Sequence, residues 1–330
     1  MHKITLIPGD GIGPEVMKAA VEIIEATGVD IVWEERQMGQ TAVEKYQSTM
    51  PENLVKSLEE NKVAFKGPVS TFIGGFRSVN IELRQRFNLY ANIRPIKSLK
   101  GFKTRYDNVD IVVFRENTED LHLGIEHMIG KDAAEAIRII TREASERIAS
   151  QAFSYAVREK RKKITCIHKA NVLQLTDGLF LSSVRAIATK FPDIEFTEMI
   201  AETAFLQLVQ NPSRFDVIVA PNLYGDLITD LCAGLVGGLG VVPGVNLGAE
   251  CAVFEATHGT AMHLVGKGIA NPTACIMSGA MMLKYLGEKT AAERIEKALT
   301  KVISEGKYIT PDMGGTATTK EMAAAIIKEL

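Results

Sequence analysis

Short apolar runs alternate along the chain with longer stretches in which apolar residues recur every three or four positions. Runs of the first kind predict strands, and stretches of the second kind predict amphipathic helices. The predicted strands lie at 3–7, 31–37, 62–68, 111–117, 163–173 and 215–223. The predicted helices lie at 14–27, 43–48, 52–61, 133–159, 271–287 and 291–306. Strands that alternate with helices in this way are typical of an α/β fold.

Two segments partly match known motifs, but other residues in each segment argue against the match. Residues 231–249 carry no charge over 19 positions, close to the length of a membrane-spanning helix. Their six glycines and Pro243 instead indicate a buried helix followed by a glycine-rich loop. The turn at 9–14 follows a strand and opens a helix, as a dinucleotide-binding fingerprint does, but Pro14 stands where the fingerprint needs its last glycine. This excludes an ordinary Rossmann site and favours a structural turn.

Composition narrows the class of partner. A chain of 330 residues is long enough for about two domains. Its 38 basic and 40 acidic residues give a net charge of −2, so we expect no binding of nucleic acid or anionic membranes and a small molecule as partner. Four cysteines without a CxxC pair exclude a zinc ribbon and fit a reducing compartment. Because the N-terminus does not read as a secretory signal, we expect a cytoplasmic protein.

Three arginines stand where they could bind an anion. Arg84 lies one helical turn after Asn80, in a segment that Ser78 can open as a helix, and the amino end of a helix favours anions. Arg94 follows, and Arg115 ends an apolar strand, where it could bind a carboxylate with both guanidinium nitrogens. Together they could hold an acid with several charges. The alternative is a capping serine with solvated arginines.

Asp226 and Asp230 are four residues apart at the start of a predicted helix, so their carboxylates share one face. No lysine or arginine occurs between 215 and 266 to relieve their repulsion. A divalent metal or an arginine from elsewhere would do so, and oxygen ligands favour Mg²⁺ or Mn²⁺ over zinc. In the alternative interpretation Asp226 caps the helix and Asp230 is solvated.

Two further segments could contribute to a site. Lys169 ends an apolar strand, where burial and cationic neighbours could lower its pKa for proton transfer. It could equally extend its ammonium group into solvent. The small residues at 254–261 and 268–272 would let the backbone approach a flat or phosphorylated ligand closely, although they also suit a tight turn.

Taken in order, these segments resemble one family, the metal-dependent β-decarboxylating dehydrogenases that oxidise isocitrate, isopropylmalate, homoisocitrate or tartrate. The resemblance extends from 7–16 to 310–319 and rests on GGFRSVNIELRQRFNLYANIRP, RENTED, IHKAN, NLYGDLITD, FEATHGTA and GIANPTA. It implies two intertwined α/β domains rather than a Rossmann fold, with the active site in the cleft between them. The cofactor-side domain would comprise 1–97 plus 236–330, and a smaller domain with the dimer interface would comprise 98–235. It also implies a homodimer with shared active sites, or a higher oligomer.

The resemblance further implies roles for individual residues. The implied substrate-binding residues are Ser78, Asn80, Arg84, Arg94, Arg115 and Asn171; the implied metal ligands are Glu202, Asp226 and Asp230; the implied residues for the nicotinamide cofactor are Thr71, His258, Gly259, Thr260, His263 and Asn271. Lys169, supplied like Asn171 by the second subunit, would transfer a proton. In the implied reaction a bound Mg²⁺ or Mn²⁺ acidifies the C2 hydroxyl, hydride passes to NAD, CO₂ leaves and an acid protonates the enol carbon.

Ser78 and Asn80 indicate the substrate within this family. The isocitrate branch carries this polar pair for the γ-carboxylate, whereas the isopropylmalate branch has apolar side chains there and homoisocitrate enzymes lack the pair. A polar pair rejects an apolar substituent because its buried donors would stay unpaired. We therefore expect oxidative decarboxylation of isocitrate to 2-oxoglutarate, with homoisocitrate and 3-isopropylmalate as alternative substrates.

Three positions depart from the family pattern. His122 stands where the family has a tyrosine and could replace it as proton donor, and Glu202 stands where a third metal aspartate is expected. His263 replaces an aspartate by which NAD enzymes contact the adenosine ribose. The segment 310–315 lacks the tyrosine and arginine of NADP enzymes, so we favour NAD. These departures also admit a non-catalytic regulatory subunit of a hetero-oligomeric isocitrate dehydrogenase.

Overall fold

The computed structural model describes residues 1–70 and 78–330. Within these residues ten strands form one mixed sheet in the order β2-β1-β3-β12-β11-β4-β5-β10-β8-β9, and β6 pairs with β7 apart from it. The strands are β1 (His2–Ile7), β2 (Ile31–Glu35), β3 (Val63–Lys66), β4 (Ala91–Lys97), β5 (Asp110–Glu116), β6 (Glu126–Ile129), β7 (Ala133–Ala136), β8 (Lys163–His168), β9 (Glu195–Ile200), β10 (Val217–Ala220), β11 (Pro243–Leu247) and β12 (Ala252–Ala256). The helices are α1 (Gly13–Ala26), α2 (Gln40–Tyr46), α3 (Glu52–Asn61), α4 (Val79–Arg86), α5 (Arg142–Arg158), α6 (Thr176–Ala188), α7 (Ala201–Gln210), α8 (Asn222–Leu235), α9 (Thr273–Tyr285), α10 (Lys289–Glu305) and α11 (Thr319–Lys328). The α/β class expected from the sequence is confirmed.

Two adjacent strands near the middle of the sheet carry two of the candidate arginines. β4 and β5 run antiparallel, with Arg94 opposite Val113 and Asn92 opposite Arg115. β4 also pairs antiparallel with β11, and parallel pairs extend the sheet on both sides. The expected domain boundary at residue 97 falls at the end of β4. The division of the chain into two domains stays a prediction.

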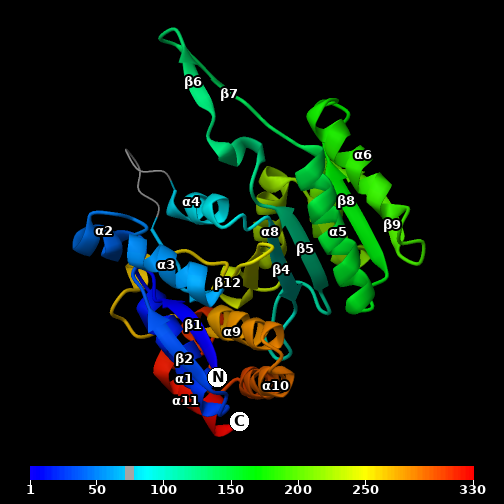
Figure 1. The fold of residues 1–330 in the computed structure, drawn as a ribbon. Coiled ribbons are helices and arrows are strands. Elements are labelled where there is room, and N and C mark those ends of the chain that lie inside the picture. The colour runs from blue at the N-terminus through cyan, green and yellow to red at the C-terminus, as the bar shows by residue number, and fades with distance from the viewer. Residues whose placement is uncertain (71–77) are drawn as a thin grey trace.

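Helices cover the sheet and enclose its core. Figure 1 shows α5 and α6 beside β8 at one end of the sheet, and α1 and α11 near β1 and β2 at the other. Phe65, Phe114, Phe153 and Phe254 lie in the core, each at most 2% exposed. Full burial of one such side chain contributes roughly 1.5–3 kcal/mol. This core fixes the strands from whose ends the candidate site residues project.

The helix predicted over 133–159 is wrong in its first part. Residues 133–136 form β7, which pairs with β6 in an arm that projects from the body of the molecule (Figure 1). The helix itself, α5, begins at Arg142, because the Thr141 hydroxyl accepts a hydrogen bond from the Ala144 amide and caps its amino end. Every residue of β6 and β7 is exposed in this chain. The conformation of the arm is therefore set by strand pairing rather than by burial.

The uncharged segment 231–249 contains more regular structure than the sequence suggests. Its first part is the end of α8, but 243–247 form β11, which lies between β4 and β12. The predicted glycine-rich loop is therefore partly a strand. Among the helices that the structure describes, none has the length and apolar character needed to cross a membrane.

The turn at 9–14 packs against backbone rather than around an open space. A Cβ atom at Gly11 would lie 2.1 Å from the carbonyl oxygen of Thr260, and one at Gly9 would lie 2.1 Å from that of Pro68. The Ile12 amide donates to the Thr260 oxygen at 3.0 Å. These glycines are thus required by close contacts with the protein itself. The interpretation of this turn as structural is confirmed.

Candidate active site

Three arginines from three elements come within electrostatic range of one another. Arg94 in β4 and Arg115 at the end of β5 are 5% and 3% exposed, and Arg84 lies in the last turn of α4. Burial lowers the pKa of Arg94. Burial, together with the charge of Arg84, lowers the pKa of Arg115 to about 9. An anion with several carboxylates would relieve the repulsion among these three charges.

Arg94 has an unused donor in a buried position. Its Nε donates to Asn92 Oδ1 at 2.8 Å, while Nη1 is buried and has no hydrogen-bond partner among the described residues. Gly244 leaves space for the side chain, since a Cβ atom there would approach Arg94 Cδ to 3.0 Å. A buried donor without an acceptor costs free energy. A substrate carboxylate would supply the missing acceptor.

Arg115 connects β5 to the helix that carries the two candidate metal aspartates. Its Nε donates to Asn222 Oδ1 at 2.8 Å, its Nη1 forms an ion pair with Asp226, and its Nη2 lies 3.2 Å from His122 Nε2. Gly225 of α8 packs directly on the arginine, because a Cβ atom there would lie 2.7 Å from Arg115 Cβ and Cγ. The position of Arg115 therefore depends on the close approach of α8.

The segment expected to select the substrate lies at the start of α4. Ser78 is the N-cap residue of this helix, but its side chain makes no capping hydrogen bond to the helix. The alternative interpretation of Ser78 as a capping serine is therefore wrong. Ser78, Asn80 and Arg84 are all half-buried. Thr71, which we expected at the cofactor, lies outside the described residues.

Asp226 and Asp230 lie one turn apart in α8, whose N-cap is Pro221, so Asp226 does not cap the helix. Burial alone would raise the pKa of Asp226, but the contact with His122 and the charge of Arg115 hold it at about 2. Burial and the charge of Asp226 raise the pKa of Asp230. The cation that relieves the aspartate pair thus comes from β5, outside the uncharged stretch. We call Arg84, Arg94, Arg115, Asp226 and Asp230 the arginine–aspartate cluster.

The donor set of this cluster fits a hard divalent cation in part. Two carboxylates on one helix face supply the oxygen ligands that Mg²⁺ and Mn²⁺ prefer. In the described parts of the chain, no group of three or more His, Cys, Asp or Glu side chains is arranged to hold a metal ion. The expected third ligand, Glu202, instead forms an ion pair with Lys169. This chain alone does not bring the three expected carboxylates together.

Lys169 and Glu202 form a second group of candidate residues. Lys169 follows β8, Glu202 lies in the first turn of α7, and their hydrogen bond lowers the pKa of Glu202. Asn171 is exposed nearby in sequence. In the part of the chain that the structure describes, no hydrogen bond or ion pair joins Lys169 or Asn171 to the arginine–aspartate cluster. The candidate site residues therefore fall into two groups within one chain.

His122 belongs to the arginine–aspartate side. It lies in the short 3-10 helix η1 (Asp120–Leu123), and its Nε2 is 3.2 Å from Arg115 Nη2 and 3.7 Å from Asp226 Oδ2. Because a guanidinium can only donate, Nε2 accepts this hydrogen bond when the imidazole is neutral, and the proton then resides on Nδ1. Nδ1 is buried without a hydrogen-bond partner among the described residues. The loop after Arg115 therefore brings an imidazole to the cluster although histidine is shorter than tyrosine.

The expected cofactor residues lie on the loop after β12. His258 Nδ1 lies 3.0 Å from the carbonyl oxygen of Gly259, and burial lowers the pKa of the ring, so its neutral form prevails at pH 7. Thr260 is held by the contact of its oxygen with the turn at 9–14. A Cβ atom at Gly259 would meet no atom of the described residues within 4 Å. This loop is therefore open above Gly259, as a bound nucleotide requires.

Two further cofactor candidates differ in how firmly they are held. Asn271 is 7% exposed; its Nδ2 donates to Asp312 Oδ2 at 2.9 Å and its Oδ1 accepts from the Thr273 amide at 3.0 Å. His263 lies exposed in a one-turn 3-10 helix. The residues present fit a dinucleotide cofactor, with an open backbone, a neutral imidazole and a fixed amide.

The sequence interpretation missed a buried ion-pair group beside the site. Arg138 lies between Asp120 and Asp177, whose side chains are fully buried. Asp120 belongs to the RENTED motif and so was visible in the sequence. Arg138 and Asp177 stand 18 and 57 residues further along the chain than Asp120, and no local pattern connects them.

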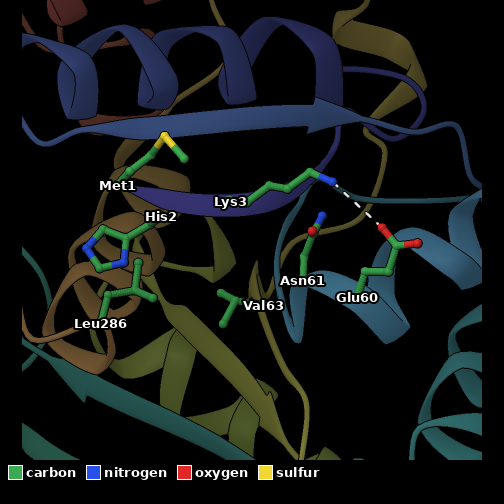
Figure 2. A pocket seen from close by; sticks show the side chains of 7 residues that line it. All are labelled: Met1, His2, Lys3, Glu60, Asn61, Val63 and Leu286. Carbon is green, nitrogen blue, oxygen red and sulfur yellow. Dashed lines mark ion pairs between the residues drawn. The ribbon is translucent and has the colours of Figure 1, made fainter.

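A separate hollow opens at the N-terminal end of β1, with a volume of about 470 Å³. Figure 2 shows its lining residues, among them Lys3 and Glu60, which form an ion pair at 3.7 Å. None of its lining residues belongs to the arginine–aspartate cluster or to the cofactor loop. It therefore plays no part in the candidate site.

Comparison with known proteins gives consistent matches along the whole chain. Residues 3–326 match the family described as "Isocitrate/isopropylmalate dehydrogenase". The chain is 49% identical over 329 residues to a protein of Drosophila melanogaster named as the probable alpha subunit of mitochondrial NAD isocitrate dehydrogenase, covering 99% of this chain and 87% of that protein. It is 47% identical to a protein of Dictyostelium discoideum named as a regulatory subunit of the mitochondrial NAD enzyme, covering 100% and 92%. The crystal structure of isocitrate dehydrogenase from Methylococcus capsulatus matches with a TM-score of 0.97 and 51% identity, covering 100% of this chain and 99% of that one.

These names correct two expectations. We expected a cytoplasmic protein, whereas the curated relatives are mitochondrial by name. We expected a homodimer, whereas those relatives are named as alpha or regulatory subunits, which indicates hetero-oligomers. Both expectations are therefore wrong. Proteins of many compartments have widely spaced thiols and no recognisable secretory signal, so these features do not identify the compartment. A single sequence contains no direct information on the chains with which the protein assembles.

Proposed function

Because the chain belongs to the isocitrate/isopropylmalate dehydrogenase family, we propose that it is a catalytic subunit that oxidises isocitrate with NAD and releases 2-oxoglutarate and CO₂. The family and its α/β fold, both expected from the motifs, are confirmed by the comparisons. The observation that carries the proposal is the buried Nη1 of Arg94, which has no partner among residues 1–70 and 78–330, beside Arg115 and the two aspartates of α8.

Substrate binding rests on the three arginines. Isocitrate brings three carboxylates, and Arg84, Arg94 and Arg115 offer guanidinium donors to them. Arg94 Nη1 gains an acceptor that the described part of the chain does not offer it. Ser78 and Asn80 at the start of α4 hydrogen-bond the γ-carboxylate, which favours isocitrate over acids with an apolar group at that position. Homoisocitrate and 3-isopropylmalate remain the alternative substrates.

Asp226 and Asp230 would hold Mg²⁺ or Mn²⁺, and a third ligand, such as Glu202, would come from outside the arginine–aspartate cluster. When bound, the ion would supply Lewis-acid chemistry to the substrate. Asp226 suits this role because it remains ionised down to a pH of about 2. Its ion pair with Arg115 neutralises it in the free protein.

Two side chains handle protons. His122 is placed to deliver one at the substrate side of the cluster, since in the described residues no hydrogen-bond partner competes for its Nδ1. Lys169 serves in proton transfer within the site of a neighbouring subunit, together with Asn171, in line with the separation of the two residue groups in one chain. NAD supplies the hydride acceptor when bound, and His258, Gly259, Thr260, His263, Asn271 and the undescribed Thr71 line its binding site.

The second candidate function is that of a regulatory subunit that binds isocitrate without turnover. It is favoured by the 47% identity to a protein named as regulatory and by the replacement of the family tyrosine by His122. Retention of Lys169, Asp226, Asp230 and the three arginines supports the catalytic role instead. The names of the relatives support assembly with related chains in a hetero-oligomer.

The purified chain should be tested with isocitrate, homoisocitrate and 3-isopropylmalate, each with NAD or NADP and with Mg²⁺ or Mn²⁺. We expect reduction of NAD with isocitrate only in the presence of a divalent metal. A rise in melting temperature with isocitrate but no turnover under any condition would refute the catalytic role and support the regulatory one. If isocitrate produces no turnover and no rise in melting temperature, both the catalytic and the regulatory role are refuted.

A further inference from the structure

A buried guanidinium connects three parts of the candidate site. Arg138, in the segment between β7 and α5, has a side chain only 10% exposed and lies between two aspartates that are 0% exposed. Its Nε and Nη2 donate to Asp120 at 2.5 and 3.2 Å, and its Nη1 donates to Asp177. Its Nη1 also lies 3.3 Å from the hydroxyl of Tyr224 in α8. One side chain thus contacts η1, α6 and α8.

Asp120 connects η1, the short helix that carries His122, to α8, the helix that carries the two candidate metal ligands. Its carboxylate accepts a hydrogen bond from the Leu223 amide, in the first turn of α8, at 3.0 Å. Its backbone has φ +74°, a left-handed conformation that non-glycine residues adopt rarely and at a cost. The carboxylate contacts with Arg138 and Leu223 offset that cost. Because His122 is two residues further on in the same short helix, its place depends on this anchor.

Asp177 fixes the backbone of the candidate lysine. It lies in the first turn of α6, and its Oδ2 accepts a hydrogen bond from the Lys169 amide at 2.6 Å. Its other oxygen accepts from Arg138. The guanidinium of Arg138 lies between these two buried carboxylates and offsets their charge, since an unpaired buried charge is strongly unfavourable. Removing Arg138 therefore affects both anchors together.

We propose that Arg138 is a positioning residue that holds the His122 turn and the Lys169 backbone in a fixed relation to each other. The inference rests on the proposed function, in which these two residues handle protons. Among the described residues, Arg138 has no hydrogen-bond or ion-pair partner in common with Arg84, Arg94 or Arg115. Its loss should therefore slow the chemical steps and leave the binding of isocitrate largely intact.

The first test compares Arg138→Met, Arg138→Lys and the control Arg185→Met in the full chain. Arg185 is a matched control because it also forms a bidentate ion pair, here with Glu198, but on the exposed surface of α6. A displacement of about 1 Å in a catalytic group costs roughly 100-fold in rate. We expect Arg138→Met to lower kcat by roughly 10- to 100-fold with little change in KM for isocitrate. Arg138→Lys, which keeps the charge, should restore most of kcat, and Arg185→Met should match the wild type.

The second test measures amide hydrogen exchange and needs no activity. Arg138→Met and Asp177→Asn should both speed exchange at the Lys169 amide while amides in β5 stay protected. Asp177→Asn added to Arg138→Met should have little further effect on kcat, because both changes break the same link. If Arg138→Met does not fold, kcat and amide exchange at Lys169 are both measured in Asp177→Asn alone.

Unchanged exchange at Lys169, wild-type kcat in Arg138→Met, or a rise in KM alone would each overturn the proposal. So would additive effects of the two substitutions on kcat. A wild-type chain that does not turn over isocitrate would instead count against the proposed function, and the exchange measurement would still decide whether Arg138 anchors Lys169.

Discussion

Gly225 offers a sharp test of the geometry around Arg115. A Cβ atom at this position of α8 would lie 2.7 Å from both Cβ and Cγ of Arg115. Ordinary carbon contacts are about 3.5–4.0 Å, so Gly225→Ala forces an overlap of roughly 1 Å. The arginine has to move away from α8, and with it the guanidinium that contacts Asn222, Asp226 and His122.

Two opposing effects decide the stability of this variant. Alanine gains about 0.8–1 kcal/mol over glycine from helix propensity. Overpacking of a buried contact costs about 1–3 kcal/mol. The two partly cancel, so we expect a destabilisation between zero and about 2 kcal/mol. Stability alone is therefore a poor reporter of the clash.

The effect on substrate binding should be larger. If the shifted Arg115 loses one charge-assisted hydrogen bond to a carboxylate, the loss is about 1.5–3 kcal/mol. Since about 1.4 kcal/mol corresponds to a factor of ten, KM for isocitrate should rise roughly 10- to 150-fold. Steady-state kinetics with isocitrate and chemical denaturation of the free protein measure the two quantities separately.

Gly234→Ala is the matched control, because Gly234 lies near the end of the same helix and a Cβ atom there would meet nothing within 4 Å in the part of the chain that the structure describes. It should leave KM unchanged and stabilise the protein slightly. A wild-type KM in Gly225→Ala, or equal effects of the two substitutions on KM, would refute the view that α8 positions Arg115 for the substrate.

Three further predictions concern other parts of the site. Replacing both Ser78 and Asn80 by leucine should raise KM for isocitrate and relax the rejection of 3-isopropylmalate, because the γ-carboxylate loses its partners; unchanged ratios of kcat/KM for the two acids would contradict the assignment. His122→Phe should lower kcat with little change in isocitrate affinity, because the imidazole beside Arg115 and Asp226 is lost; a wild-type kcat in this variant would show that another group donates the proton. Asp226 has its pKa lowered to about 2 from 3.8, so its ionised form stabilises the fold above pH 3.8 and this contribution is lost as the pH falls through 2. Asp226→Asn should therefore flatten the fall in stability between those two values, measured by urea unfolding, and an unchanged acid limb would mean that Asp226 is not held by Arg115 and His122 in solution. The effect should be modest because the Asp226 side chain is 47% exposed.

The sequence predicts best those elements whose pattern is local and repeated. β1, α1 and α3 follow directly from apolar runs and helical spacing, and their bounds agree within a residue or two. The arm formed by β6 and β7 was missed because small residues at 133–136 suit a helix as well as a strand, and only pairing with 126–129 decides. β11 was missed because Pro243 and Gly244 read as a loop, although neighbouring strands on both sides hold the segment extended.

The candidate site was predictable in its residue types but not in its grouping. Arg115 stands near the end of β5 and Asp226 in the first half of α8, where a functional side chain is recognisable from sequence, whereas Arg94 lies in the middle of β4. The pairing of Arg115 with Asp226 depends on a contact across 111 positions of sequence. The same holds for Arg138, whose two partners come from different elements. Such contacts are set by sheet order, which a single sequence does not contain.

The strand order also bears on how the chain folds as it leaves the ribosome. β3 pairs on one side with β1 and on the other with β12, and β4 pairs with β11, so β3 and β4 obtain their full set of neighbours only after β11 and β12 are made. By contrast β5, β10, β8 and β9 come from one continuous stretch and can pair before the chain is complete. Strand edges that stay unpaired during synthesis promote aggregation. Nascent chains stalled before β11 should therefore depend on chaperones for the strands made first, while the stretch from β5 to α8 is already protected from proteolysis.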